Sequence, residues 1–328
     1  MLLRYFFRRP LPIYYSIEEL FAIVEPHLPS DIQPSHYYAP RVSNGLCSIL
    51  YNCIHAAFRQ GEVNHITGDI HYLALLLRKS RTVLTIHDLD SMQRRSHLKN
   101  LIIRFLWFWL PIRRVQYITV ISDFTKNQLL HEFKIDPKKI IVIPNCISQK
   151  LNYSPKIIDK NCPIILQIGT KPNKNFMRVI QAISTIRCKL LVLGHSVEEY
   201  VTELNQYQID YERFFNLPIE QVYDLYRRCD MLCFCSTYEG FGMPIIEAQA
   251  IGRAVITSDL SPMKEVAGQG ALLVNPYQTA EIHRAITQLI TDDNLRNNLI
   301  TNGLENVKRF SATVVAQQYA EVYRKIKI

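Results

Sequence analysis

The segment that decides the fold reads Ser236-Thr237-Tyr238-Glu239-Gly240-Phe241-Gly242-Met243-Pro244-Ile245-Ile246-Glu247-Ala248. The short apolar run at residues 230–235 before it is typical of a strand buried on both faces. Pro244 favours the first position of a helix that Gly252 can end, and residues 254–257 predict the next strand. The segment therefore predicts a strand, loop, helix and strand in succession, with two glycines in the loop.

The loop has the chemistry of an anion site. A loop that enters a helix presents backbone N–H groups and the positive end of the helix dipole, and phosphate is the natural guest. Gly240 and Gly242 allow a close approach to the backbone. Pro244 has no N–H, so the expected donors are four backbone amides, those of Phe241, Gly242, Met243 and Ile245.

Two carboxylates flank this anion site. Glu239 lies in the loop and Glu247 in the predicted first helical turn. A carboxylate can accept hydrogen bonds from paired sugar hydroxyls, those of a ribose on one side and of a hexose on the other. The alternative is an ordinary glycine turn with both glutamates on the surface.

The arrangement Glu239, seven residues, Glu247, with Gly-Phe-Gly-Met-Pro inside it, resembles the donor-site signature of retaining glycosyltransferases of family 4, the glycosyl transferases group 1. The resemblance implies an α/β protein of the GT-B fold, with two Rossmann-like, doubly wound domains facing a central cleft. We expect an acceptor-binding domain at residues 1–150 and a nucleotide-sugar-binding domain at residues 151–328. The last helix, near 312–325, is expected to cross back onto the first domain.

Short apolar runs that alternate with helical patterns also predict parallel sheets with helices on both faces. Besides the strands at 230–235 and 254–257, we expect strands at residues 3–8, 63–66, 82–86, 116–121, 140–145, 163–168, 189–193, 212–216 and 271–274.

A second loop of the same kind follows the strand predicted at residues 163–168. It carries Gly169 and Thr170 as further donor-binding candidates, and Lys174 matches the lysine with which the family pairs the diphosphate. As an isolated lysine, Lys174 would be a solvated surface residue. Many relatives have an arginine shortly after the glycine, and whether Lys171 replaces it stays open.

His87 follows the strand predicted at residues 82–86, at the edge where open α/β sheets bind ligands. The resemblance implies a catalytic position for His87 beside the donor sugar, and the alternative is a local hydrogen bond next to a turn capped by Asp88. Asp88-Leu89-Asp90 also has the form of a metal-binding triplet, but we do not interpret it as a metal site. No metal requirement and no cofactor besides the donor substrate are expected.

The net charge of +9 is concentrated in the first half of the chain. Residues 1–150 hold 19 Lys and Arg against 11 Asp and Glu, which indicates an acidic partner such as a membrane surface or a phosphate-bearing acceptor. A helix predicted at residues 98–110, with Trp107, Trp109 and flanking arginines, suits a membrane interface or packing on the sheet. The resemblance favours a lipid-linked hydroxyl acceptor. No nucleic-acid motif is present, so nucleic acid is not an expected partner.

Targeting signals are not evident in the sequence. No apolar stretch is long enough for a transmembrane helix, and the first ten residues lack the pattern of a signal peptide. Eight scattered cysteines without Cys-x-x-Cys spacing indicate reduced thiols. We therefore expect a cytoplasmic protein, peripheral at the inner membrane face.

The expected activity is transfer of a hexose from a nucleotide diphosphate sugar to a hydroxyl with retained anomeric configuration, in polysaccharide, lipopolysaccharide or glycolipid assembly. Glu239 is expected to bind the sugar at the catalytic centre and Glu247 the ribose. A nucleotide-sugar epimerase or a non-catalytic nucleotide-sugar-binding partner of the same fold are the alternatives. Residues 8–15 lack the glycine-rich loop of many relatives, so the family resemblance carries over least to the acceptor-binding side.

Overall fold

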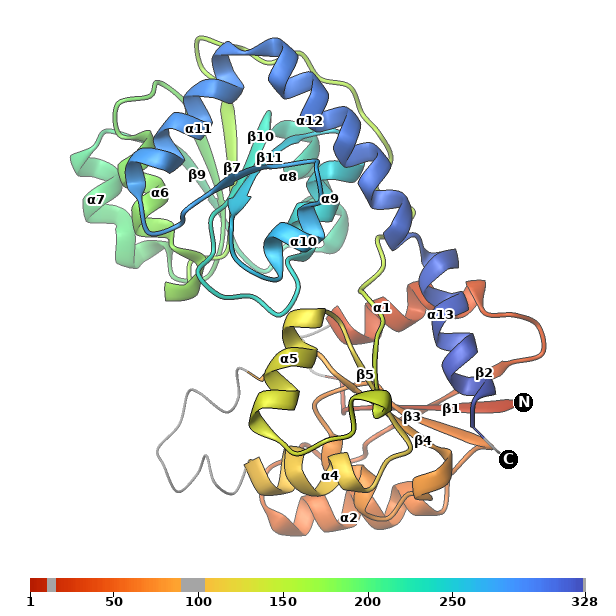
Figure 1. Ribbon diagram of the computed structural model, residues 1–328. Coiled ribbons are helices and arrows are strands. Elements are labelled where there is room, and N and C mark those ends of the chain that lie inside the picture. Colours follow the sequence, from red (N-terminus) through yellow and green to blue (C-terminus); the bar gives the residue numbers. More distant parts are fainter. Residues whose placement is uncertain (11–15, 90–103, 327–328) are drawn as a thin grey trace. The chain divides into compact units, whose positions relative to one another are not determined.

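The computed structural model describes residues 1–10, 16–89 and 104–326. The chain divides into two compact units. The first comprises residues 1–146 together with 312–328, so the last helix, α13, belongs with the N-terminal part of the chain; the second comprises residues 147–311. Each unit contains a six-stranded parallel sheet with helices on both faces (Figure 1).

The sheet of the first unit has the order β2-β1-β3-β4-β5-β6. Its strands are β1 (Leu2–Phe7), β2 (Gln33–Tyr38), β3 (Val63–Ile66), β4 (Thr82–Ile86), β5 (Tyr117–Val120) and β6 (Ile140–Val142). Its helices are α1 (Ser16–Val24), α2 (Leu46–Ala57), the π-helix η5 (Arg104–Trp109), α4 (Leu110–Arg113), α5 (Asp123–Glu132) and α13 (Ala312–Arg324). Short 3-10 helices are η1 (Glu25–His27), η2 (His71–Leu75), η3 (Lys79–Arg81) and η6 (Pro137–Lys139).

The first sheet separates two apolar cores. One core joins the sheet to α1 and α13 and contains Phe21, Tyr319 and Tyr323. The other joins it to α2, η2, η5, α4 and α5, and Figure 1 shows α2 and α4 on the same side of the strands. Because both faces are covered, β3 and β4 are fully buried, as is typical of parallel strands.

The second unit has the sheet order β12-β11-β10-β7-β8-β9. Its strands are β7 (Ile164–Ile168), β8 (Lys189–Leu193), β9 (Asp210–Phe214), β10 (Met231–Phe234), β11 (Ala254–Ser258) and β12 (Leu272–Val274). Its α-helices are α6 (Phe176–Ile183), α7 (Val201–Gln206), α8 (Ile219–Arg228), α9 (Met243–Ile251), α10 (Met263–Ala267), α11 (Thr279–Thr291) and α12 (Asp293–Asn306). Short 3-10 helices are η7 (Pro172–Lys174), η8 (Val197–Tyr200) and η9 (Val307–Phe310). Counted within the unit, the strand order is the 3-2-1-4-5-6 of dinucleotide-binding folds.

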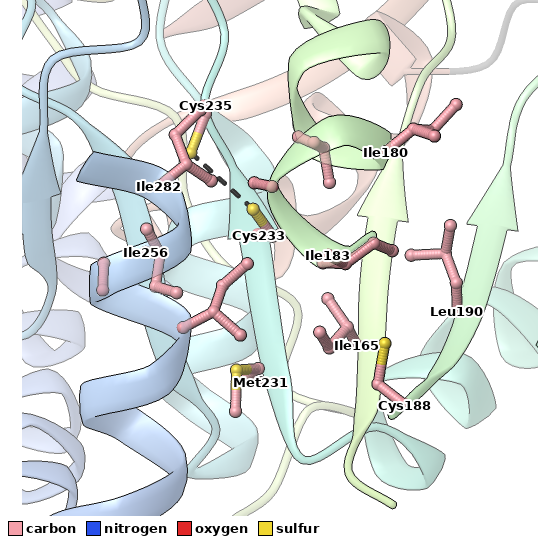
Figure 2. Packing of buried hydrophobic residues seen from close by; sticks show 14 of the residues in the cluster. Ile165, Ile180, Ile183, Cys188, Leu190, Met231, Cys233, Cys235, Ile256 and Ile282 are labelled. Atoms are coloured by element: carbon pink, nitrogen blue, oxygen red, sulfur yellow. Dashed lines mark hydrogen bonds between the residues drawn. The ribbon is translucent and has the colours of Figure 1, made fainter. Parts of the chain in front are cut away.

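The core of the second unit lies between its central strands and helices α6 and α11 (Figure 2). Cys233 and Cys235 point to the same side of the sheet, as residues two apart along an extended chain do, and their sulfurs are 3.7 Å apart. This contact and burial raise the pKa of the Cys235 thiol well above its ordinary value. All eight cysteines carry free thiols, and these two pack as small apolar residues.

Most sequence-predicted elements are confirmed, and four differ. The strand expected at residues 140–145 ends at Val142. The strand β2 was not expected, because the segment Gln33-Pro34-Ser35-His36 has no apolar run. The strand expected at residues 212–216 begins and ends two residues earlier, at Asp210–Phe214. The helix expected from residue 98 is described only from Arg104 onward, and residues 104–109 form a π-helix. Residues 11–15 of the glycine-free loop, Asp90 and residues 98–103 lie outside the described residues.

Candidate functional site

The candidate site lies where the strand order of the second sheet reverses. β7 and β10 are neighbours at the centre of this sheet, and the chain leaves them toward opposite edges. Their carboxyl ends are therefore the switch point at which doubly wound sheets bind ligands. The loops that follow these two strands, residues 169–175 and 235–242, contain most of the sequence-predicted donor residues.

Lys174 and Glu239 come from these two loops and meet at the switch point. The Lys174 Nζ lies 2.6 Å from the Glu239 Oε1, and the two side chains are only 19% and 14% exposed. The ammonium also lies 4.7 Å from the centre of the Phe234 ring, at the end of β10. The sequence-predicted cation and sugar-binding carboxylate are therefore in direct contact.

Gly169 makes room for the lysine side chain. Its φ of +87° favours glycine, and a Cβ at this position would lie 2.7 Å from the Lys174 Cγ. Thr170 is buried, and its hydroxyl accepts a hydrogen bond from the Ser196 N–H at 3.1 Å. The Gly169 backbone thus shapes the path of Lys174, while the Thr170 hydroxyl holds the neighbouring loop.

Two asparagines that sequence reasoning missed join the two loops. The Asn173 carbonyl accepts the Thr237 N–H at 2.8 Å, and its side-chain amide donates to the Tyr238 carbonyl at 2.9 Å. Asn175 is buried with a φ of +58°, and its amide donates to the Cys235 carbonyl at 3.0 Å and to a carbonyl of the loop after β12 at 2.6 Å. These bonds fix the loop of Glu239 against the loop of Lys174.

Helix α9 starts directly behind the glycine loop, in which Gly240 is half-buried. Gly242, with a φ of +107°, is its N-cap, and the helix begins at Met243, so Pro244 is its second residue rather than its first. The Ile245 N–H donates to the Gly242 carbonyl at 3.0 Å, so Ile245 is no longer an expected anion donor. The amides of Phe241, Gly242 and Met243 remain as candidates.

Glu247 is the fifth residue of α9, in its second turn rather than its first, and it contacts a tyrosine of α8. The Tyr226 hydroxyl donates to the Glu247 Oε2 at 2.5 Å. Complete burial and the adjacent carboxylate raise the pKa of Tyr226 well above its ordinary value, so this hydroxyl stays a donor. Tyr226 was not predicted as a site residue, because in the sequence it is one more residue of the apolar face of α8.

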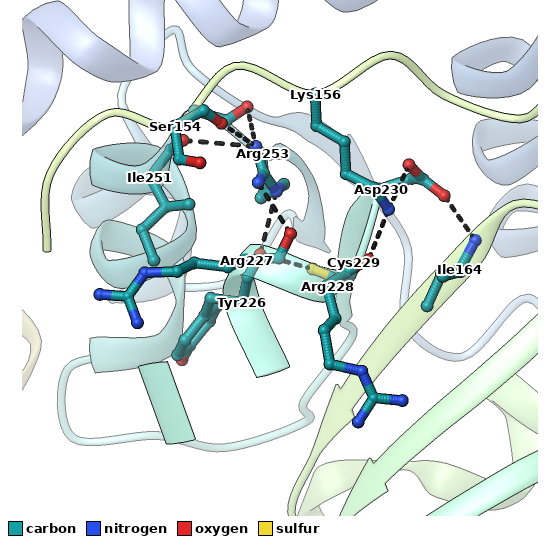
Figure 3. Close-up of polar contacts among 11 residues, drawn as sticks. Ser154, Lys156, Ile164, Tyr226, Arg227, Arg228, Cys229, Asp230, Ile251 and Arg253 are labelled. Carbon is teal, nitrogen blue, oxygen red and sulfur yellow. Dashed lines mark hydrogen bonds and ion pairs between the residues drawn. The ribbon is translucent and has the colours of Figure 1, made fainter. Parts of the chain in front are cut away.

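The far ends of α8 and α9 are held together by a buried arginine (Figure 3). The Arg253 guanidinium donates to the Tyr226 carbonyl at 2.9 Å, to the Arg227 carbonyl at 3.0 Å and to the Ser154 carbonyl at 2.7 Å. A cation at helix C-termini satisfies carbonyls that have no partner within the helix and is favoured by the helix dipoles. Arg253 therefore fixes the two helices that carry Tyr226 and Glu247.

His87 lies in the first unit, after β4. Its Nε2 is 2.8 Å from the Thr67 carbonyl oxygen. His87 therefore has a hydrogen-bond partner on the loop that follows the neighbouring strand β3, and its role beside a donor sugar stays a prediction. At the same edge of the sheet, Arg8 pairs with both Glu18 and Asp69.

No group of three or more His, Cys, Asp or Glu side chains suited to a metal ion occurs within residues 1–10, 16–89 and 104–326. Over the same part of the chain, no helix is both long and apolar enough to cross a membrane.

Two family models match the chain in succession. The model of Glycosyltransferase Family 4 matches residues 34–150, and the model of Glycosyl transferases group 1 matches residues 150–306. The second match contains every candidate donor residue of the second unit.

Individual relatives agree with these models. The chain is 25% identical over 272 residues to O-antigen chain mannosyltransferase B of Escherichia coli, covering 75% of this chain and 71% of that protein. It is 29% identical over 230 residues to O-antigen chain mannosyltransferase RfbU of Salmonella typhimurium, covering 67% of this chain and 63% of that protein.

Solved structures share the fold of the whole chain. Anabaena HepE in complex with UDP superimposes with a TM-score of 0.77 at 16% identity, over 99% of this chain and 100% of that one. A glycosyltransferase from Rickettsia africae gives a TM-score of 0.75 at 18% identity, over 99% and 98%. The predicted GT-B fold of two Rossmann-like domains is confirmed.

Proposed function

The chain belongs to the glycosyltransferases, with a Family 4 match followed by a group 1 match, and from this premise we propose that it transfers a hexose from a nucleotide diphosphate sugar to a hydroxyl acceptor with retention of configuration. One observation carries the proposal. Lys174 and Glu239 are in contact at the switch point of the second sheet, and the loop that carries Glu239 leads into α9. A cation, backbone amides and a carboxylate there suit a diphosphate that is bonded to a sugar.

Lys174 and the start of α9 would stabilise the leaving group. When the bond between sugar and diphosphate breaks, negative charge develops on the phosphate oxygen that leaves. An ammonium and helix N-terminal amides in a partly buried place favour that charge. Their interaction is stronger in the transition state than with the intact donor, which is the requirement for faster chemistry. Because the chain itself supplies this positive charge, we propose that the step needs no metal ion.

The two glutamates would bind hydroxyls on either side of the diphosphate. The Glu239 Oε1 accepts from Lys174, and the carboxylate has further acceptor sites for sugar hydroxyls. Tyr226 holds the Glu247 Oε2 and so fixes the direction of the carboxylate that would bind the ribose. An ion-paired carboxylate is a weak nucleophile, so we assign Glu239 to sugar binding, with acceptor attack on the face that the diphosphate leaves.

The names of the relatives suggest the setting. Two of them are O-antigen chain mannosyltransferases, so we assign this chain to polysaccharide, lipopolysaccharide or glycolipid assembly and place GDP-mannose first among the donors to test. The hydroxyl acceptor is proposed to be lipid-linked or part of a growing glycan.

A thermal-shift screen of the whole protein with GDP-mannose and with UDP-, ADP- and dTDP-sugars tests the proposal. A ligand at 100 times its dissociation constant adds about 2.7 kcal/mol to the folded state, which is a clear rise in melting temperature. We expect one nucleotide sugar to give this rise in the wild type and in Lys308→Ala, but not in Lys174→Ala or Glu247→Ala. Lys308 is the matched control, because it is a lysine of the same unit that also pairs with a glutamate.

The outcomes separate the proposal from its alternatives. If the nucleotide sugar raises the melting temperature of Lys174→Ala as much as that of Lys308→Ala, the donor does not bind at Lys174. With the donor known, epimerisation without any acceptor would favour an epimerase. Transfer to a hydroxyl with inverted configuration, read from the anomeric coupling of the product by NMR, would contradict retention. A smaller rise in melting temperature with the nucleotide sugar in Lys171→Ala would assign this exposed lysine to the donor site as well.

A further inference from the structure

Helix α2 of the first unit exposes its large apolar residues to solvent, whereas a helix that covers a sheet normally buries them. Its buried residues are small or polar: Asn52, Cys53 and Ala56. Its solvent side carries large apolar residues at four-residue intervals, all between 46% and 83% exposed: Leu46, Leu50, Ile54 and, at the C-cap, Phe58. A contiguous apolar stripe on the solvent side marks an interaction surface.

The reverse orientation is fixed by the buried side of the helix. The Asn52 amide donates to the Arg41 carbonyl at 2.9 Å and to the Tyr72 hydroxyl at 3.0 Å, and its oxygen accepts the Arg41 N–H at 3.1 Å. Rotating the helix to bury the leucines would break these bonds and leave the buried Tyr72 hydroxyl without this partner. The apolar stripe therefore belongs on the solvent side.

Further exposed aromatic residues lie on the same side of the sheet. Phe105 and Trp109 of η5 are exposed and stack with ring centres 5.0 Å apart. Helices α2, η2, η5 and α4 all pack against one core, and Figure 1 shows α2 and α4 on one side of the strands. We call the exposed side of these elements the α2–α4 face.

The side chains of the α2–α4 face carry no negative charge. Segments 41–60, 70–81 and 104–116 contain no Asp or Glu. They hold six exposed basic side chains: Arg41, Arg59, Arg78, Lys79, Arg113 and Arg114. Three acidic groups next to these segments already have partners: Asp69 pairs with Arg8, Glu132 with Arg104 and Glu62 with the amino terminus.

The cations lie among the aromatic rings of the face and close to one another. Two guanidinium groups lie over rings, Arg41 at 4.0 Å from the centre of Tyr51 and Arg113 at 3.9 Å from that of Trp109. Burial, together with the charges of the nearby Lys79 and Arg113, lowers the pKa of Lys139 to about 8. The face therefore combines an apolar stripe with a dense positive field.

This combination selects one occupant. A two-fold contact with a second copy would place each basic patch against itself, and like charges across an interface are repulsive. Leu, Ile, Phe and Trp side chains interleaved with Arg and Lys, without acidic residues, match the boundary between acyl chains and anionic headgroups. We propose that the α2–α4 face docks the protein on an anionic lipid bilayer.

Flotation of the whole protein with vesicles tests this. We expect binding to vesicles of phosphatidylcholine mixed equally with phosphatidylglycerol, weak binding to phosphatidylcholine alone, and weaker binding as salt is raised. Leu50→Glu combined with Ile54→Glu should lower the bound fraction by about tenfold or more. The matched control is Ile157→Glu combined with Phe215→Glu, two exposed apolar residues of the second unit, which should bind as the wild type does.

A second pair of variants tests the charge without touching the apolar stripe. Arg59→Gln with Arg113→Gln should reduce binding to the anionic vesicles, whereas the exposed Arg187→Gln should not. Unchanged circular dichroism and melting temperature show that each variant is folded.

Two results would overturn the proposal. One is equal flotation of Leu50→Glu/Ile54→Glu and the wild type. The other is a lipid-free dimer that the same variant dissociates, because the face would then bind a second copy. Flotation requires neither donor nor acceptor, so its failure would leave the proposed transferase activity standing.

Discussion

The side chain of Lys174 crosses directly over the backbone at Gly169 on its way to Glu239. Gly169→Ala places a methyl group 2.7 Å from the Lys174 Cγ and puts an L-residue at a φ of +87°. We expect a stability loss of about 1–2 kcal/mol from the backbone. Displacing the ammonium should weaken donor binding by about ten- to a hundredfold, the worth of one charged hydrogen bond. Titration calorimetry with the identified nucleotide sugar measures it.

Gly268→Ala is the control for backbone strain. Gly268 also has a positive φ, +56°, and its added Cβ would meet the Asn306 side chain rather than a site residue. This variant should lose stability without losing donor affinity. Equally weak donor binding in Gly169→Ala and Gly268→Ala would show that backbone strain alone acts, and the assignment of Lys174 to the diphosphate would fail.

Single residues differ in how far the sequence could predict them. Lys174 and Glu239 were predictable as neighbours, because parallel strands place the loops that follow them at one edge of a sheet. Tyr226 was not, because its contact with Glu247 depends on the rotation of α8 against α9. Asn175 gave no signal either, since a positive φ and bonds to carbonyls far along the chain leave no local pattern.

At the scale of elements, Asn175 joins the loop after β7 to the ends of β10 and β12. Asn175→Ala removes its bonds to the Cys235 and Pro276 carbonyls and leaves both buried oxygens without this donor. It also places alanine at a φ of +58°. We expect a loss of about 2–4 kcal/mol in unfolding free energy, measured by urea titration, from unmade buried bonds and backbone strain.

Asn175→Gly separates the two contributions. Glycine accepts the positive φ but also lacks the amide, so it should be more stable than Asn175→Ala by about 1 kcal/mol while remaining less stable than the wild type. Equal stability of the two variants would contradict the backbone contribution. A glycine variant as stable as the wild type would contradict the contribution of the hydrogen bonds.

The elements that sequence patterns missed or misplaced are mainly at sheet edges. β2 is the edge strand next to β1 and is partly exposed, so it needs no apolar run, and the edge tolerates Pro34. β9 is an edge of the second sheet, and its exposed residues left its start uncertain by two positions. The interior strands β3, β4 and β8 were predicted at their observed bounds, because burial on both faces demands continuous apolar residues.

At the scale of the whole molecule, acid should weaken the first unit through two buried histidines. Burial lowers the pKa of His65 to about 3 and that of His71 to about 4, against 6.5 for an ordinary histidine. Between about pH 4 and pH 6.5 the two histidines are protonated in the unfolded chain but not in the folded chain. The contribution of the two neutral histidines to stability is therefore present above pH 6.5 and is lost as the pH falls below it. From pH 7 to pH 5 the loss should be about 4 kcal/mol for the pair.

Burial, with a smaller contribution from the charge of His87, keeps His65 neutral, and its surroundings supply the test. Its two ring nitrogens lie 2.7 Å from the Tyr323 hydroxyl of α13 and 2.7 Å from the Thr85 hydroxyl of β4, so protonation would leave a buried cation facing hydroxyls. Urea unfolding at pH 7 and pH 5 should show about half the pH-dependent loss in His65→Gln. His131→Gln, at a side chain that is 86% exposed, should leave the loss unchanged. If His65→Gln and the wild type lose the same unfolding free energy between pH 7 and pH 5, protonation of His65 does not cause the loss of stability in acid.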